Sequence, residues 1–192
     1  MADTDQTAQH GFVGQVLLAM PAMSDPRFER AVIYMCAHNE DGAMGIVINK
    51  PLDSIGFREL LGELDIQTSP DIRDVPVHFG GPVENQRGFV LHSKDYSHTE
   101  TLLVDETIGL TATVKILRDM ASGDGPVRSI LALGYAGWGP GQLESEIQQN
   151  AWLTVPASDE LLFDAANNEK WERAFNSIGV DLSVLSGSSG RA

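Results

Sequence analysis

Apolar and polar positions follow one another in blocks that predict a mixture of strands and helices. Residues 130–138 are apolar and rich in β-branched side chains, which predicts a buried strand. A glycine-rich loop follows, and then Leu143 and Ile147 lie four positions apart, as on one face of a helix over 142–150. Residues 151–155 predict another strand. Strand, tight loop, helix and strand therefore form the most compact unit in the sequence.

Other blocks predict further elements on both sides of this unit. Strands are expected over 11–19, 31–37, 43–49, 75–79, 88–92, 102–104 and 108–111, and helices over 26–30, 55–64, 113–121, a short stretch capped by Ser158, and 168–178. The pair Asp41 and Gly42 predicts a hairpin between the second and third strands. Gly80 and Gly81 mark a sharp turn, across which the fourth and fifth strands are expected to pair antiparallel.

Strands and helices are mixed without a strict β-α-β alternation, which favours the α+β class. The 192 residues contain no internal repeat and no linker, so we predict one domain over residues 11–182. Residues 1–10 are polar and are expected to be disordered. Residues 183–192 are small and polar and are expected to form a flexible tail.

Charge is the most informative feature of the composition. The chain has 27 acidic and 13 basic residues and a formal net charge of −14. The basic residues are scattered singly, whereas proteins that bind nucleic acid neutralise phosphates with clustered Lys and Arg, so direct DNA binding is disfavoured. No apolar run is long enough to span a membrane, and no targeting segment is recognisable. With a single cysteine, these features predict a cytoplasmic protein without an internal disulfide.

The glycine loop between residues 134 and 141 is a candidate phosphate site, because glycines that open a helix often bind anions. Its spacing matches neither a dinucleotide-binding nor a P-loop pattern, and Pro140 removes one amide donor. Glu144 already offers a carboxylate to the start of the helix. A structural turn is therefore favoured, in which Trp138 either fills the core or offers a stacking surface.

Cys36 and His38 lie two apart on a predicted strand, so they share a face, and the imidazole could lower the pKa of the thiol. That arrangement would make a reactive or redox-sensing cysteine. The alternative, which we favour, is a buried cysteine in an apolar strand. No metal-binding spacing is present near His38 or elsewhere, so neither a metal nor another cofactor is expected.

Three segments carry a family resemblance. LLAMPAMSDPRFERAVIYMCAHNEDGAMGIVINKPL, HFGGPVENQRGFVLHS and LALGYAGWGPGQLESEIQQNAWLTVPA, in this order, resemble the bacterial AlgH/YqgE family. The resemblance implies a compact α+β fold whose branching sheet curls into a pseudo-barrel flanked by helices. It also carries the label of transcriptional regulator, but it supplies no catalytic residue and no ligand.

The three glycine-bearing segments could converge on one cleft, because loops held by rigid strands often carry binding residues. The expected lining residues are His38, Asn39, Gly80, Gly81, Pro82, Trp138, Gly139 and Gln142. The alternative is that the glycines only close tight turns.

Three function classes are compatible with the sequence. We expect foremost a non-enzymatic regulatory protein that acts indirectly, through an unidentified small molecule or protein partner. The alternatives are a direct DNA-binding regulator and a thiol-based redox sensor or enzyme that uses Cys36 and His38. Since no catalytic signature is present, the sequence leans away from an enzyme without deciding the question.

Overall fold

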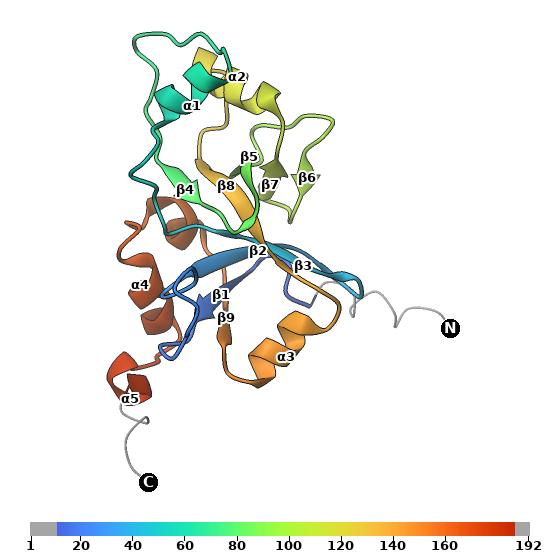
Figure 1. The fold of residues 1–192 in the computed structure, drawn as a ribbon, viewed down its shortest axis with the longest axis vertical. Coiled ribbons are helices and arrows are strands. Elements are labelled where there is room, and N and C mark those ends of the chain that lie inside the picture. The colour runs from blue at the N-terminus through green and yellow to red at the C-terminus, as the bar shows by residue number, and fades with distance from the viewer. Residues whose placement is uncertain (1–10, 187–192) are drawn as a thin grey trace. The chain divides into compact units, whose positions relative to one another are not determined.

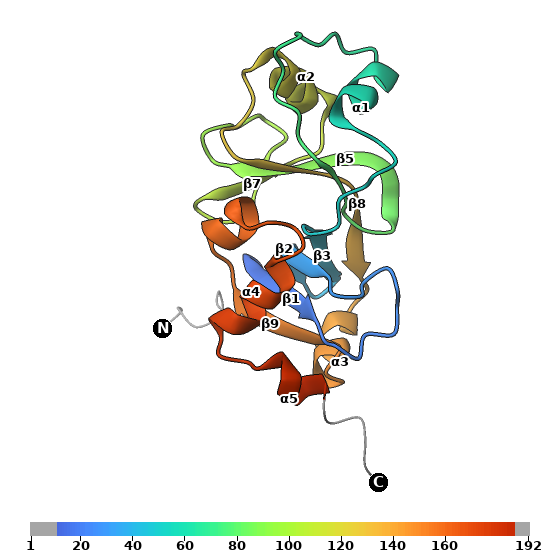
Figure 2. The same cartoon turned by 90° about the vertical axis from the view of Figure 1, so that its left-hand side faces the viewer.

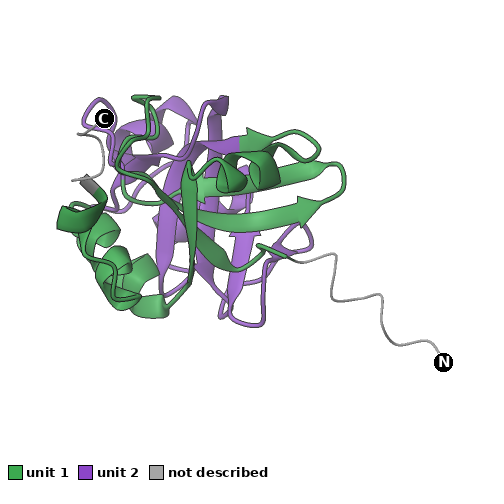
Figure 3. Cartoon of the chain, turned by 90° about the horizontal axis from the view of Figure 1, so that it is seen from below, with its two compact units in different colours: residues 1–49, 137–192 green, residues 50–136 purple. Residues whose placement is uncertain are grey.

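Two units make up the part of the chain that the computed structural model describes, residues 11–186 (Figure 3). Unit 1 contains residues 11–49 and 137–186, and unit 2 contains residues 50–136. Strand β8 (Ser129–Trp138) begins in unit 2 and its last two residues belong to unit 1. Strands and helices are mixed in both units, which confirms the α+β class. The description of residues 11–182 as a single domain stays a prediction.

Unit 1 is built on an antiparallel sheet with the strand order β3-β2-β1-β9 (Figure 1). The strands are β1 (Gln15–Ala19), β2 (Val32–Asn39), β3 (Gly42–Val47) and β9 (Trp152–Pro156). The helices are α3 (Gln142–Gln148), the π-helix η1 (Glu160–Asp164), α4 (Lys170–Ser177) and α5 (Leu182–Ser186). The two-residue turn between β2 and β3 confirms the predicted hairpin.

The core of unit 1 lies on the inner strands β1 and β2, whose apolar side chains are almost completely buried. Helix α4 packs against β1, and Figure 2 shows the two elements side by side. Trp171 and Phe175 of α4 are buried, and their rings meet edge to face at 4.8 Å. The indole nitrogen of Trp171 donates a hydrogen bond of 2.9 Å to the carbonyl of Ala19. One helix thus covers the sheet and satisfies a polar atom at the end of β1.

Lys170 is an unusual member of this core, because its side chain is only 3% exposed. Its ammonium group donates to the carbonyls of Ile48 and Leu162, at 3.0 and 2.8 Å. It therefore ties the end of β3 to η1. Burial disfavours the charged form and lowers the pKa of Lys170 to about 8.

This lowered pKa predicts a pH dependence of stability. Between about pH 8 and the ordinary lysine pKa the unfolded chain binds a proton that the folded chain has released, so the free energy of unfolding rises with pH. Relative to Lys170→Met, which cannot titrate here, the wild type should gain about 2 kcal/mol between pH 7 and pH 9.5. Urea denaturation of both proteins at each pH measures the difference. A constant difference would contradict the lowered pKa.

Unit 2 contains a second sheet with the strand order β6-β7-β5-β8, in which neighbours pair antiparallel. Its strands, besides β8, are β4 (Val77–Phe79), β5 (Val83–Ser93), β6 (Leu102–Leu103) and β7 (Ile108–Thr111), and its helices are α1 (Phe57–Glu63) and α2 (Val114–Ser122). Strand β4 pairs with β8 in parallel. A buried cluster that includes Phe57, Leu61, Ile116 and Leu131 joins the two helices to this sheet.

One predicted strand pairing is wrong. The sequence predicts that residues 75–79 and 88–92 pair with each other, but β4 and β5 both pair with β8, at the same residues 131–133. Gly80 and Gly81 explain the difference. A Cβ on either glycine would collide with the backbone of β8, so the turn runs directly against that strand. The chain therefore crosses from one side of β8 to the other.

Two further expectations concern short segments. Residues 26–30 form turns and no helix, and Asp25 accepts a hydrogen bond of 3.0 Å from the amide of Arg27. The expected flexible tail begins within α5. The rest of that tail and the expected disordered segment 1–10 lie outside the described residues. No helix within residues 11–186 is long and apolar enough to cross a membrane.

Candidate functional site

His38 lies at the end of β2, where it meets the first turn of α3. Its Nε2 atom is 2.5 Å from a carboxylate oxygen of Glu144, and the ring of Phe12 lies 4.9 Å from the imidazole. The pKa of Glu144 is lowered, first by the hydrogen bond from its own backbone amide and then by His38. The carboxylate therefore occupies the amide end of α3, which agrees with a structural turn rather than a phosphate site.

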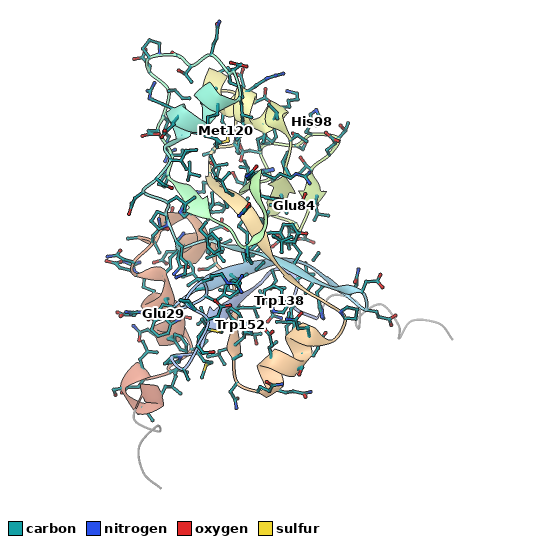
Figure 4. All side chains as sticks on the ribbon, viewed as in Figure 1. Glu29, Glu84, His98, Met120, Trp138 and Trp152 are labelled. Carbon is teal, nitrogen blue, oxygen red and sulfur yellow. The ribbon has the colours of Figure 1, made fainter. Side chains whose placement is uncertain are left out.

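Glu146 accepts the hydrogen bonds that hold the rest of the glycine loop in place. One oxygen of its carboxylate accepts hydrogen bonds from the indole nitrogens of Trp138 and Trp152, at 2.9 and 2.8 Å. The other oxygen accepts from the amide of Gln142 at 2.9 Å, and Gln142 in turn accepts from the backbone amide of Gly139 at 3.0 Å. The two buried indoles meet edge to face, 6.0 Å apart (Figure 4). The loop is thus closed by hydrogen bonds to side chains of α3.

The predicted cleft residues fall into two groups. His38, Asn39, Trp138, Gly139 and Gln142 belong to unit 1, where α3 bonds to His38 through Glu144 and to Trp138 through Glu146. Asn39 accepts a hydrogen bond of 2.8 Å from the amide of Asp41 in the hairpin turn. The other group, Gly80, Gly81 and Pro82, belongs to unit 2 and passes against β8. A single cleft shared by both groups stays a prediction.

Cys36 is 3% exposed and lies at an irregularity in the pairing of β2 with β3. Its thiol donates to the carbonyl of Tyr34 at 3.6 Å. Burial raises the pKa of the thiol far above its ordinary value. A thiol in this state is protonated at neutral pH and closed to reagents, which argues against the reactive-cysteine alternative.

Cys36 should accordingly resist iodoacetamide in the native protein at neutral pH. We expect labelling at least about 100-fold slower than in the urea-unfolded chain, because reaction requires local opening of β2. Mass spectrometry of timed samples measures both rates. Equal rates would restore the thiol alternative.

A buried hydrogen-bonded network in unit 2 centres on His92. Nε2 of His92 lies 2.8 Å from the hydroxyl of Thr111, which lies 2.7 Å from the hydroxyl of Thr101. Nδ1 of His92 is 2.9 Å from the carbonyl of Ser93, so it carries the proton, and Nε2 accepts from Thr111. A hydroxyl bonded to an imidazole resembles a nucleophile and its base. His92 and Thr111 are both fully buried, however, so no substrate reaches them. These hydrogen bonds are therefore structural.

A groove of about 560 Å³ lies in unit 2, between the end of α1, the start of α2 and the polar part of β5. Figures 1 and 2 show α1 and α2 side by side in this unit. The apolar lining of the groove comes from the two helices, and most of its polar lining comes from β5. The lining residues are Leu60, Leu64, Glu84, Asn85, Gln86, Arg87, Gly88, Ala112, Thr113, Val114 and Leu117.

The β5 wall of the groove is irregular. Val83 pairs with Tyr135 of β8 and Gly88 pairs with Leu133, so the residues 84–87 lie outside the regular ladder. Glu84, labelled in Figure 4, has a φ of 46°, a left-handed conformation that non-glycine residues seldom adopt. Bulges and backbone strain of this kind concentrate at binding sites. No sequence motif marks the groove, whose walls come from three separate segments.

Several basic residues are paired with other groups of the protein. Several are engaged by carboxylates: Arg27 with Asp25, Arg30 with Glu172, Arg87 with Glu84, Lys115 with Asp119, and Arg173 with Glu160 and Glu169. Arg58 instead donates to backbone carbonyls of the loop after α1. Within residues 11–186, no three His, Cys, Asp or Glu side chains gather as metal ligands would.

Comparisons with known proteins agree on one relationship. The model of the AlgH-like family matches residues 16–183. A UPF0301 protein of Rhodospirillum rubrum is 55% identical over 179 residues, which cover 93% of each chain. Another UPF0301 protein, from Afipia carboxidovorans, is 54% identical over 187 residues, which cover 93% of this chain and 89% of the other.

Two solved structures are also similar. The solution structure of the AlgH protein from Pseudomonas aeruginosa has a TM-score of 0.78 and 40% sequence identity, with 100% of both chains covered. A crystal structure of a Corynebacterium diphtheriae protein has a TM-score of 0.72 and 20% identity, with 97% of this chain and 94% of the other covered. The second likeness concerns the fold alone.

Proposed function

The chain belongs to the AlgH-like family, and from that premise we propose that it is a non-enzymatic regulatory protein that binds a small molecule in the groove of unit 2. The groove itself carries the proposal. Its volume of about 560 Å³, its apolar floor and its polar rim suit a small organic molecule, since such sites usually measure about 300 to 1,000 Å³.

A binding role is favoured over catalysis by the state of the titratable groups. Cys36 is buried and protonated, and the His92–Thr111 pair is closed to solvent. His38 bonds to Glu144 in a contact that closes the loop. These groups hold the fold together, whereas Leu64 and Val114 in the lining of the groove leave apolar surface exposed. A protein with such a groove fits regulation by a bound ligand.

The regulator label of the family fits this proposal as an indirect effect on transcription. A net charge of −14 repels DNA, and the named ion pairs further reduce the free positive charge. The single buried thiol fits a reducing compartment, so the proposal places the protein in the cytoplasm.

Random duplex DNA should not bind. A titration followed by fluorescence anisotropy at several low salt concentrations should stay flat, because the chain has a net charge of −14 and its basic residues are scattered singly along the sequence. Binding that weakens steeply with salt would support the direct DNA-binding alternative instead.

A fragment screen by nuclear magnetic resonance tests the proposed site. We expect fragments that bind to shift the backbone amides of residues 84–88 and 112–117. Shifts confined to residues 38, 39, 80–82 and 138–142 would instead support the predicted glycine-motif cleft as the ligand site. No saturable shift with any fragment would contradict ligand binding as the function.

A further inference from the structure

We propose that the groove of unit 2 binds an apolar molecule that carries one carboxylate. The inference rests on the proposed function, in which the groove holds a small molecule, and it adds the chemical class of that molecule. Three features support it. The groove has an apolar floor, a helix begins at one end of it without a side-chain cap, and its rim carries one positive and one negative side chain although the chain as a whole has a net charge of −14.

The floor of the groove favours an apolar ligand body. Leu60 reaches it from α1, Leu64 from the position directly after α1, and Val114 and Leu117 from α2. Leu64 and Val114 keep 37% and 43% of their surface exposed. A ligand that covered them would remove apolar surface from water, which is the main favourable contribution to binding of this kind.

The start of α2 favours a carboxylate at one end of that body. Thr113 occupies the N-cap position in an extended conformation, yet its side chain caps no amide. The first turn of α2 contains no acidic residue, although acidic side chains are favoured there. The first amides of this nine-residue helix are thus left without a side-chain acceptor, and Thr113 borders the groove at that point.

The hydroxyl of Thr113 gives a second observation at the same point of the groove. Its hydroxyl is buried and has no hydrogen-bond partner within the described residues. Polar atoms in this state are uncommon, because burial without a partner is unfavourable. Rotation about χ1 would turn the hydroxyl without breaking a hydrogen bond, so it could donate to a ligand oxygen in the groove.

The rim of the groove has no net charge, in a chain whose net charge is −14. Arg87 and Glu84 are the charged residues that line the groove, and their ion pair is long, at 3.5 Å, with both side chains about half exposed. Such a pair contributes little, so the guanidinium group can turn to a ligand carboxylate. Arg87 also lies over the ring of Phe89, at 5.3 Å. Lys115 in the first turn of α2 is held by Asp119 at 2.7 Å.

Sodium octanoate and its neutral counterpart octanamide are suitable probes, because they share one apolar body. Titration of the full chain, followed by amide shifts, should give an octanoate dissociation constant on the order of a millimolar for a ligand of this size. Octanamide should bind at least about tenfold more weakly. Equal binding would overturn the carboxylate inference and leave the proposed function intact.

Thr113→Asp places a carboxylate of the protein where the ligand carboxylate is expected. It should abolish octanoate binding while the thermal midpoint stays equal or rises, since aspartate is a good N-cap. Val127→Asp is the matched control, because Val127 is 71% exposed, lies in the same unit and does not line the groove. This variant should bind octanoate as the wild type does.

The outcomes separate the ligand class from the proposed function. Unchanged octanoate binding by a folded Thr113→Asp protein would overturn the inference. If Thr113→Asp fails to fold, Arg87→Gln replaces it and should weaken octanoate at least about fivefold without affecting octanamide. If fragments bind in the groove but octanoate does not, the ligand class is wrong. If no small molecule binds there, the proposed function itself fails.

Discussion

Gly81→Ala is expected to destabilise the protein by at least about 4 kcal/mol, an exceptionally large effect for a single added methyl group. Gly81 has a φ of 154°, and a Cβ at this position would overlap the backbone of Tyr135 and Ala136 in β8. Backbone atoms in a central strand cannot move aside as a flexible side chain can. The strand would have to leave its register, so complete loss of folding at 37 °C is also consistent with this prediction.

The control for this prediction is Gly62→Ala. Gly62 lies in α1 of the same unit, has an ordinary helical conformation, and nothing would come within 4 Å of its added Cβ. Alanine should therefore stabilise the protein by about 0.5 to 1 kcal/mol. Urea denaturation of the three proteins gives both changes. A Gly81→Ala protein as stable as the wild type would show that the turn does not run against β8.

Glu146→Leu should lower the free energy of unfolding by about 3 to 5 kcal/mol. The substitution removes the acceptor of two indole N–H groups, and Trp138 and Trp152 are only 7% and 4% exposed. Each buried donor left without a partner is destabilising, and Gln142 loses its acceptor as well. The tryptophan emission of the native protein should also change, because two of the three indoles lose a charged neighbour.

Two further variants distinguish the effect of losing the hydrogen bonds from the effect of placing a leucine in α3. Glu146→Gln keeps an acceptor oxygen without the charge, so its loss should be about 1 to 2 kcal/mol. Gln148→Leu also replaces a polar side chain by leucine, at an exposed position of α3, where it should alter stability by less than about 0.5 kcal/mol. If Glu146→Leu and Gln148→Leu have the same effect, the indole bonds do not hold the loop.

Local patterns are sufficient to predict most elements. The apolar run, glycine loop and polar segment around residue 138 predict β8, α3 and β9, because each has a strong periodicity of its own. Asp41 and Gly42 predict the hairpin because few residues adopt its turn. The mixture of these elements indicates the α+β class, and the AlgH/YqgE resemblance, confirmed by the family match, agrees with it.

Long-range partners are beyond local patterns. Apolar strands at 77–79 and 88–92 satisfy the same periodicity whether they pair with each other or with β8. Only the close approach of Gly80 and Gly81 to β8 distinguishes the two, and that is a tertiary contact. The bridge from Glu146 to both indoles also depends on how the loop folds back. A carboxylate between two tryptophans is the one sequence signal that suggests it.

The groove is invisible in the sequence for a similar reason. Its walls come from residues 60–64, 84–88 and 112–117, none of which carries a binding motif. The polar run at residues 84–87 between apolar strand positions is the available signal, and it fits an ordinary loop equally well. In the predicted glycine-motif cleft, Trp138, Gly139 and Gln142 are instead joined to one another or to Glu146 by hydrogen bonds within unit 1, and the residues 80–82 belong to unit 2.

The most direct test of a carboxylate-binding groove is a measurement of nuclear Overhauser effects between octanoate and the methyl groups of the protein. We predict contacts from the ligand chain to the methyl groups of Leu60, Leu64 and Val114, and their loss in Thr113→Asp. Contacts that map to unit 1, or none at saturating octanoate, would contradict a carboxylate-binding groove between α1 and α2.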